Sequence, residues 1–320
     1  MTRAWSFPEA LQPPKDKISF DLEATLDAIV LLRAEIPEDA FTAQILGTER
    51  TGYGIVIGDD GLILTIGYLI TEAERIWLTT NQGAVTQGHA LAYDQATGFG
   101  LVQPLARWTQ KPLPIGSSRS VAAEDEVYVL GHGGRSHALR AKIVAKREFA
   151  GYWEYVLDEA LFTAPAHPQW GGAALVNRDG QLVGVGSLLV QEAVGGNAVE
   201  GNMFVPVDLL GSVLASLRSG ATTTARPWLG LYATELEGRL VIGGLAPGGP
   251  AEIAGLAAGD VVQRVAGEGV TGLADFFRKV WRQGPAGAGI PLRLSRNGRM
   301  LERVVLSADR NAFLRKPRLH

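Results

Sequence analysis

Cysteine does not occur among the 320 residues, so disulfides and thiol chemistry are excluded. No stretch approaches the about 20 consecutive apolar residues of a membrane-spanning helix. Residues 1–14 lack an apolar run long enough for a signal peptide, which predicts a cytoplasmic location, or a periplasmic one if the sequence is a processed form. The formal net charge of −3 favours neither nucleic acid nor a membrane as a partner. Phosphate-binding glycine motifs are missing, and no cofactor is expected.

Glycine is abundant, with 40 residues, and it suits a turn-rich β protein better than a helical one. Short aliphatic segments alternate with tight-turn sequences at 58–61 and 177–180, which is typical of barrels built from hairpins. A dense aliphatic run at 28–36 has the length of a strand, and apolar spacing predicts helices at 209–217 and 273–281. The length predicts roughly two domains, and the fold class is expected to be dominated by β structure.

Three short segments have the spacing of a known catalytic framework. Residues 54–70 read GIVIGDDGLILTIGYLI, residues 93–102 read YDQATGFGLV, and residues 167–177 read HPQWGGAALVN. They resemble the three catalytic segments of the trypsin-like serine proteases of the HtrA/Deg family. The resemblance implies a chymotrypsin-like double β-barrel with the site between two six-stranded barrels.

Each of these segments departs from the family at its catalytic position. Tyr68 stands where the family has histidine, Gly98 where it has aspartate, and Gly171 where it has the serine nucleophile. A triad needs a nucleophile, a base and a carboxylate that orients the base, and glycine supplies none of these. A shifted alignment does not restore them, because no histidine precedes His89 and no serine lies between Ser136 and Ser187. The sequence therefore predicts a serine-endopeptidase framework that lacks triad chemistry.

The oxyanion loop and the histidines give two further interpretations. By the resemblance, the amides of Gln169 and Gly171 would form the oxyanion hole, beside the bulky Trp170. His132 and His167 are weak candidates for a zinc site, together with Asp158 or Glu159. The alternative function is accordingly a hydrolase with replaced, metal-assisted chemistry, although a site without metal is favoured because no metal-ligand spacing occurs.

Residues 248–262 read GGPAEIAGLAAGDVV, which resembles the signature of an HtrA-type PDZ domain, β-rich with two short helices. The resemblance implies that the amides of Leu229, Gly230 and Leu231 bind the carboxylate of a peptide, which adds as a strand. The other residues of the predicted groove are Trp228, Phe276, Phe277 and Val280. We expect a hydrophobic free C-terminus as the ligand. In the alternative interpretation these residues hold the domain together and the groove docks internally.

The domain boundaries follow from these segments. We expect an N-terminal arm at 1–24, a pseudo-protease double barrel at 25–217, a linker at 218–225, a PDZ domain at 226–309 and a basic tail at 310–320. Aromatic residues at 149, 152, 153 and 155 lie where active relatives have the loop that senses peptide bound at the PDZ domain, and are interpreted as core or interface.

The expected partners are C-terminal or unfolded peptide segments of other proteins, with an active HtrA-like protease as a further candidate. The expected duty is that of a chaperone-like or regulatory scaffold. Trp5, Phe7 and Phe20 in the arm predict a homotrimer, because such proteases form trimers through aromatic residues of this arm.

Overall fold

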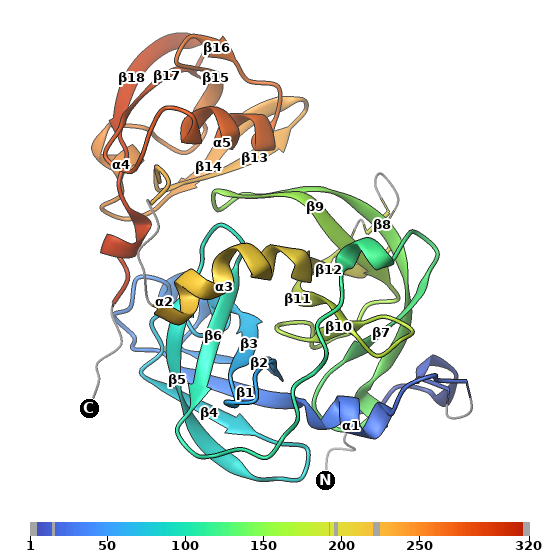
Figure 1. Cartoon of the computed structure of the whole chain (residues 1–320). Coiled ribbons are helices and arrows are strands. Elements are labelled where there is room, and N and C mark those ends of the chain that lie inside the picture. Colours follow the sequence, from blue (N-terminus) through green and yellow to red (C-terminus); the bar gives the residue numbers. More distant parts are fainter. Residues whose placement is uncertain (1–4, 15–16, 192, 195–197, 220–224, 316–320) are drawn as a thin grey trace. The chain divides into compact units, whose positions relative to one another are not determined.

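The computed structural model describes residues 5–14, 17–191, 193–194, 198–219 and 225–315. The chain forms two compact units (Figure 1). Unit 1 comprises Met1–Arg147, Glu159–Ala221 and Arg315–His320, and unit 2 comprises Glu148–Asp158 and Thr222–Leu314. In the described part of the chain no helix is long and apolar enough to cross a membrane.

Unit 1 contains two closed barrels, which confirms the predicted double β-barrel. The first has the strand order β1-β2-β3-β6-β5-β4 and the second β10-β11-β12-β9-β8-β7. The first barrel consists of β1 (Ile29–Glu35), β2 (Glu49–Val56), β3 (Ile63–Ile66), β4 (Arg75–Thr79), β5 (Val85–Tyr93) and β6 (Phe99–Pro104). The second consists of β7 (Glu126–Leu130), β8 (Leu139–Gly151), β9 (Tyr155–Ala164), β10 (Ala174–Val176), β11 (Leu182–Val190) and β12 (Gly201–Pro206).

Short helices connect and flank these strands. Asp21 caps the first helix by accepting the amide of Ala24, as its place before the helix predicts. The α-helices of unit 1 are α1 (Leu22–Asp27), α2 (Ala43–Leu46) and α3 (Leu210–Ser219). The 3-10 turns are η1 (Glu9–Leu11), η2 (Gly67–Leu69), η3 (Ser118–Ser120), η4 (Arg135–His137) and η5 (Val207–Leu209), with η6 (Arg310–Ala312) in unit 2.

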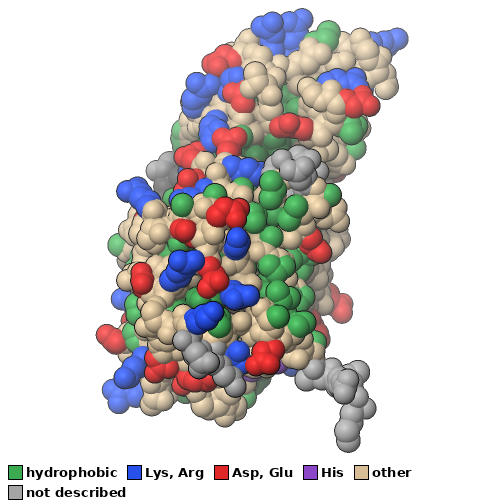
Figure 2. Space-filling model, turned by 90° about the vertical axis from the view of Figure 1, so that its right-hand side faces the viewer, with side chains coloured by type: hydrophobic (Ala, Val, Ile, Leu, Met, Phe, Trp, Pro, Cys, Tyr) green, Lys and Arg blue, Asp and Glu red, His purple; other side chains and the backbone are tan. Residues whose placement is uncertain are grey.

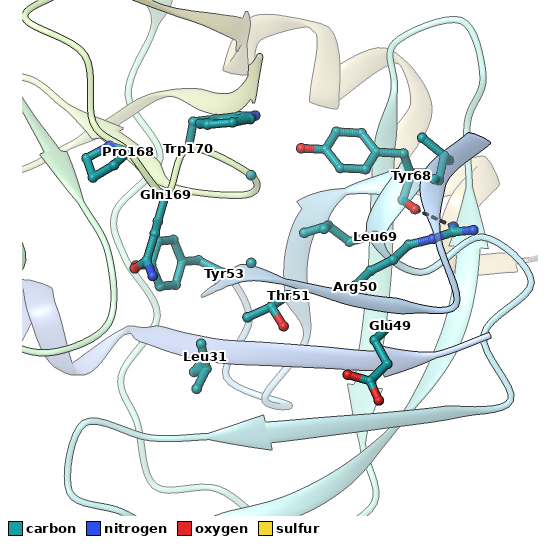
Figure 3. A pocket seen from close by; sticks show the side chains of 13 residues that line it. Leu31, Glu49, Arg50, Thr51, Tyr53, Tyr68, Leu69, Pro168, Gln169 and Trp170 are labelled. Carbon is teal, nitrogen blue, oxygen red and sulfur yellow. Dashed lines mark hydrogen bonds between the residues drawn. The ribbon is translucent and has the colours of Figure 1, made fainter. Parts of the chain in front are cut away.

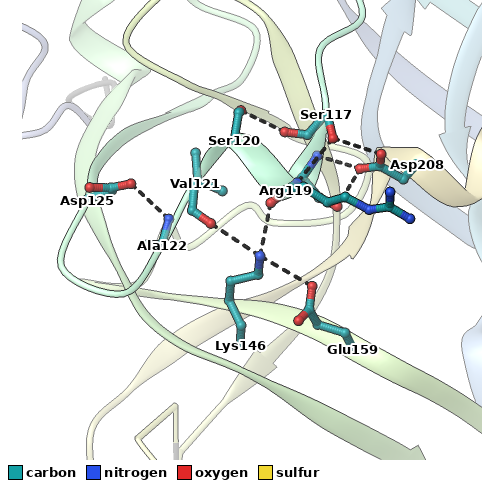
Figure 4. A network of polar contacts seen from close by, with 10 residues as sticks. Ser117, Arg119, Ser120, Val121, Ala122, Asp125, Lys146, Glu159 and Asp208 are labelled. Atoms are coloured by element: carbon teal, nitrogen blue, oxygen red, sulfur yellow. Dashed lines mark hydrogen bonds and ion pairs between the residues drawn. The ribbon is translucent and has the colours of Figure 1, made fainter.

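A polar network fixes the segment that leads into the second barrel (Figure 4). Asp208, just after β12, accepts the amide of Ser118 at 2.5 Å and the hydroxyl of Ser117 at 2.8 Å. Lys146 Nζ donates to the carbonyl oxygens of Ser118 and Val121 and pairs with Glu159 at 3.3 Å. These two carbonyl oxygens lie outside the strands, so Lys146 supplies their hydrogen-bond donors and has a structural role.

Unit 2 is a six-stranded sheet with two α-helices. Its strands run in the order β13-β14-β15-β17-β18, and β16 pairs with β15. The elements are β13 (Leu231–Leu236), β14 (Arg239–Leu245), α4 (Pro250–Ile253), β15 (Val261–Val265), β16 (Glu268–Gly269), α5 (Leu273–Trp281), β17 (Gly289–Arg296) and β18 (Arg299–Leu306). The predicted helix at 273–281 matches α5 because its apolar stripe packs into the core of this unit.

The compact units differ from the predicted domain boundaries at the hairpin tip and in the C-terminal tail, where residues 310–314 belong to unit 2. Residues 148–158, the tip of the β8–β9 hairpin, belong to unit 2, and Arg315 belongs to unit 1. Polar contacts accompany both assignments. Those of the hairpin tip are described below. Arg315 donates its amide to Glu72 of unit 1 at 2.9 Å. Residues 220–224 of the predicted linker, 316–320 of the tail, and 1–4 and 15–16 of the arm lie outside the described residues.

The N-terminal arm packs on its own barrel. Trp5 makes an edge contact with His137 and Phe7 with His167, at ring-centroid distances of 4.7 and 5.1 Å. Phe20 contacts Tyr128 of β7 in the same way. These aromatic groups therefore have partners within unit 1, and the predicted homotrimer stays a prediction.

The surface carries charges of both signs. On the face that Figure 2 presents, Lys and Arg side chains alternate with Asp and Glu side chains, and hydrophobic groups lie among them. On this face no field of one sign gathers, which agrees with a net charge of −3.

Candidate functional site

Tyr68 and Gly171 meet in a cleft of unit 1. Tyr68 lies in η2, directly after β3, and Gly171 lies in the loop before β10. The Tyr68 hydroxyl donates to the carbonyl of Ser187 at 3.1 Å. A β-carbon placed on Gly171 would stand 2.8 Å from that hydroxyl oxygen. In Figure 3 the phenol of Tyr68 points toward the loop that carries Trp170. The phenol thus occupies the space that a side chain at position 171 needs.

The buried side chain of Arg50 holds the backbone of the Tyr68 segment in place. The Arg50 guanidinium donates to the carbonyl oxygens of Tyr68 at 2.6 Å and Thr71 at 3.0 Å, and to the hydroxyl of Thr42 at 2.7 Å. Burial lowers the pKa of Arg50 to about 10, and the nearby Glu72 carboxylate acts in the opposite direction. Arg50 is still a cation at neutral pH, so its hydrogen bonds to the Tyr68 segment are charge-assisted.

Gly98 lies beside the same segment, and its backbone has a positive φ angle that strains an aspartate. Its carbonyl accepts the amide of Gly67 at 2.7 Å, and Gly67 immediately precedes Tyr68. The φ angle of Gly98 is +81°. An L-residue in this left-handed region costs roughly 1–2 kcal/mol. The structure therefore brings together all three positions singled out by the sequence, with a geometry at 98 that suits glycine.

The predicted oxyanion loop has its first amide engaged elsewhere. The Gln169 amide donates to His167 Nδ1 at 3.1 Å, and His167 Nε2 contacts the carbonyl oxygen of His137 at 2.9 Å. His167 is fully buried, and burial lowers the pKa of its imidazole. The neutral ring donates through Nε2 and accepts through Nδ1. Because the Gln169 amide serves this internal bond, it is unavailable to an oxyanion in the cleft.

The cleft itself is open and mostly apolar, with a volume of about 340 Å³. Two hydrogen bonds join its walls: the Tyr53 amide donates to the Gly171 carbonyl at 2.8 Å, and the Tyr53 hydroxyl donates to Gln169 Oε1. Its lining residues, all of them described, include no serine, cysteine, lysine or histidine: Leu31, Leu46, Glu49, Arg50, Thr51, Gly52, Tyr53, Tyr68, Leu69, Pro168, Gln169, Trp170 and Gly171. Burial raises the pKa of Tyr68, with a hydrogen bond to Trp170 opposing it, so the phenol is neutral near pH 7.

The two histidines considered for zinc bind different partners. His132 Nε2 contacts the carbonyl oxygen of Thr80 at 3.0 Å, whereas both ring nitrogens of His167 are engaged as described. Of their proposed companions, Glu159 pairs with Lys146, and Asp158 pairs with Arg278 in unit 2. Within the described residues no group of three metal-ligating side chains occurs.

In unit 2, three amides converge on one carboxylate of the chain itself. Leu229 donates to both oxygens of Glu154 at 3.0 Å, Gly230 donates to Oε1 at 2.7 Å and Leu231 to Oε1 at 3.3 Å. Glu154 lies at the tip of the β8–β9 hairpin and is 4% exposed. Burial raises its pKa to about 7, and the three amide hydrogen bonds oppose that change. These are the amides that the sequence analysis assigned to a peptide carboxylate.

The other predicted groove residues are buried in the structure, and their role in binding stays a prediction. Phe276, Phe277 and Val280 are fully buried in the core of unit 2, which also includes Val156 of the hairpin. Trp228 is buried as well, makes an edge contact with Phe313 at 4.8 Å, and pairs its backbone with Ala308. None of these four side chains offers an open wall to a ligand in this structure.

Sequence reasoning missed Glu154, Arg50 and Glu72. The aromatic residues around Glu154 marked its segment, but nothing local links residue 154 to residue 229. Arg50 and Glu72 are charged residues beside aliphatic runs, and both are buried, at 4% and 5% exposure. The sequence signal for them was a charged residue beside buried apolar segments. Such a residue is often buried as well, and a buried charge needs a polar partner.

Residues 52–185 match the family model described as trypsin-like peptidase domain. This part of the chain, which includes most of the two closed barrels, is therefore similar to a trypsin-like peptidase domain. The relatives to which the chain is similar include DegP-like and DegQ serine endoproteases.

The probable periplasmic serine endoprotease DegP-like of Halomonas elongata is 25% identical over 260 residues, covering 77% of this chain and 54% of that protein. The periplasmic pH-dependent serine endoprotease DegQ of Escherichia coli is 24% identical, covering 91% of this chain and 70% of that protein. A solved HtrA-type protease, AlgW with decapeptide, has a TM-score of 0.55 at 17% identity, covering 93% of this chain and 100% of that one. The chain thus spans about half the length of the first of these relatives.

Proposed function

We propose that this chain is a non-catalytic, HtrA-like scaffold. The observation that carries the proposal is the placement of the Tyr68 hydroxyl, 2.8 Å from where a β-carbon of residue 171 would stand. Where a protease needs a serine side chain and an imidazole, this chain has a neutral phenol packed against a glycine. A phenol whose pKa is raised by burial is a poor general base, and glycine has no nucleophilic atom.

Unit 2 supplies the proposed binding activity. We infer that it is a PDZ domain whose amides at Leu229, Gly230 and Leu231 recognise a carboxylate. The proposal is supported by the fact that all three amides donate to one carboxylate group. The ligands would be hydrophobic C-termini or unfolded segments of other proteins, and an active HtrA-type protease is a further proposed partner. The cytoplasmic location stays a prediction.

Hydrolysis of unfolded protein tests the scaffold directly. Tag-free full-length protein is incubated with fluorescein-labelled casein, alongside an active HtrA-type protease as the positive control. We expect no release of fluorescence above buffer. Trace contamination is controlled by repeating the assay with phenylmethylsulfonyl fluoride and after a second size-exclusion step. Turnover that follows the protein peak through the second size-exclusion step contradicts the proposal. If phenylmethylsulfonyl fluoride abolishes that turnover, it supports the serine-endoprotease activity named for the relatives; if the turnover persists, it supports a replaced chemistry.

A further inference from the structure

Within unit 2, the hairpin tip contacts the amide loop and β13 through residues 152–154. Glu154 gives its carboxylate to the amides of 229–231, and the carbonyl of Tyr152 accepts the amide of Ala233 at 3.2 Å. Residues 152–154 form a turn, so the contact consists of a side-chain carboxylate at the loop and one backbone hydrogen bond to β13. A bound peptide would use the same two groups of the domain, the loop amides for its carboxylate and the backbone of β13 for its chain.

Further contacts fasten the same segment on both sides. Arg278 of α5 binds Glu148 at one end of the tip and Asp158 at the other, each at 2.5 Å. Between them, Val156 belongs to the buried apolar cluster of unit 2, and Ala150 packs against it. Hydrogen bonding, apolar burial and charge pairing thus act together on one short segment of the chain.

The carboxylate of Glu154 is specifically recognised rather than merely nearby. It takes up four hydrogen bonds from three successive backbone amides. Glu154 itself has a φ of +64°, an uncommon conformation for a residue with a side chain. The surrounding contacts hold it in this conformation, which aims the side chain into the loop.

We propose that Tyr152–Glu154 is an internal ligand of the carboxylate-binding loop. This inference rests on the proposed peptide-binding function and adds its regulation: an external peptide binds only by displacing the hairpin tip. The competitor must match the chemistry of the tip, which means an extended segment ending in a carboxylate. Weak ligands therefore cannot displace the tip. The apparent affinity of the loop for a peptide is reduced in proportion to the small fraction of molecules in which the tip is released.

Peptide titration of the full chain tests this inference. The probe is a fluorescein-labelled peptide, Ala-Gly-Tyr-Trp-Val, with a free C-terminus; its first four residues copy residues 150–153, and its terminal carboxylate replaces the Glu154 side chain. Fluorescence anisotropy compares wild type with Glu154→Ala. We expect the variant to bind about tenfold more tightly or better, because the internal competitor is gone. The amidated form of the peptide should bind neither protein.

Glu237→Ala is the matched control. Glu237 is also a glutamate with positive φ, +50°, but it is exposed in the β13–β14 turn. Alanine keeps the β-carbon that strains a positive φ, so both variants retain their backbone strain, and only Glu154→Ala removes an internal ligand. If the alanine variant does not fold, Glu154→Gln keeps the size of the side chain and removes its charge, and a smaller gain in the same direction is expected.

Hydrogen exchange separates this inference from the proposed function. In wild type the amides of Leu229, Gly230 and Leu231 should exchange slowly, and in Glu154→Ala they should exchange faster while the amide of Phe276 does not. If exchange accelerates but the probe still fails to bind, the internal ligand stands and the peptide-binding function fails. Equal probe affinity of wild type and variant, or unchanged exchange at the three amides, overturns the inference.

Discussion

The Tyr68 hydroxyl stands where a side chain on Gly171 would begin, so such a side chain requires the phenol to shift. A β-carbon there would lie 2.8 Å from the hydroxyl oxygen, closer than such atoms pack. The hydroxyl cannot move freely, because it donates to Ser187 and the Arg50 guanidinium holds the Tyr68 carbonyl. The residues at positions 68 and 171 are therefore sterically coupled: the phenol of Tyr68 fills the space that a side chain at position 171 would enter.

This coupling predicts a non-additive pair of substitutions. Gly171→Ser alone should lower the free energy of unfolding by about 1–3 kcal/mol, as overpacking does. In a Tyr68→Ala background the same change should cost much less, because the space is then empty. Urea denaturation of the two single variants and the double variant gives the coupling energy. Gly211→Ser, at a position with open space around the glycine, is the control. Equal costs of Gly171→Ser in both backgrounds would refute the steric relationship.

Rebuilding the triad should give at most weak activity. The variant that combines Tyr68→His, Gly98→Asp and Gly171→Ser has all three groups, but an aspartate at a φ of +81° is strained by roughly 1–2 kcal/mol. The Gln169 amide also still donates to His167. Casein hydrolysis is the measurement, with each single restoration as an inactive control, since triad members act as a unit. A triple variant as fast as an active HtrA-type protease would show that the oxyanion loop is functional.

Burial of His167 predicts a loss of stability in mild acid. Burial lowers the pKa of His167 from its usual 6.5, so below that pH the unfolded chain takes up a proton more readily than the folded one. The His167 contribution to stability is present above pH 6.5 and decreases as the pH falls toward the lower folded-state pKa. Urea midpoints measured from pH 7.5 to 5 should therefore fall less steeply in His167→Gln than in wild type. His89→Gln, on β5, is the control, and a parallel profile for His167→Gln would refute this role.

The N-terminal arm should stabilise the barrel on which it packs. Phe7 lies 5.1 Å from the His167 ring, and its amide donates to the Ser136 carbonyl at 2.9 Å. Phe7→Ala should lower the free energy of unfolding by about 1–3 kcal/mol through lost apolar burial. Val85→Ala, at a position 60% exposed, is the control and should cost less than about 0.5 kcal/mol. Equal effects of the two changes would contradict a docked arm.

The same arm tests the predicted homotrimer. Light scattering is measured on the full chain and on a version lacking residues 1–20. A trimer that dissociates on truncation would support assembly through the arm. A monomer in both cases would reject the trimer and leave Trp5 and Phe7 with their contacts inside one chain.

The sequence predicted the framework well because local patterns encode it. Hairpin turns, aliphatic runs and the apolar stripe of 273–281 each specify an element by themselves. In the structure Gly98 contacts the residue before Tyr68, and Tyr68 lies close to Gly171, while the role of the three positions stays a prediction. Glu154 could not be predicted in the same way. It lies 75 residues before Leu229 in the chain, and its contact depends on how the hairpin tip packs in unit 2. The sequence pattern also does not show that Val156 of that hairpin shares a core with Phe276 and Phe277.

Covalent labelling tests the central claim, the absence of a serine nucleophile, most directly. Purified full-length protein is incubated with a fluorophosphonate, which forms an adduct with the activated serine of a working triad, and its intact mass is measured. An active HtrA-type protease treated in parallel should gain one adduct. The account predicts an unchanged mass for this chain, because position 171 is a glycine facing the Tyr68 hydroxyl. A stoichiometric adduct on a serine or threonine of unit 1 would contradict it.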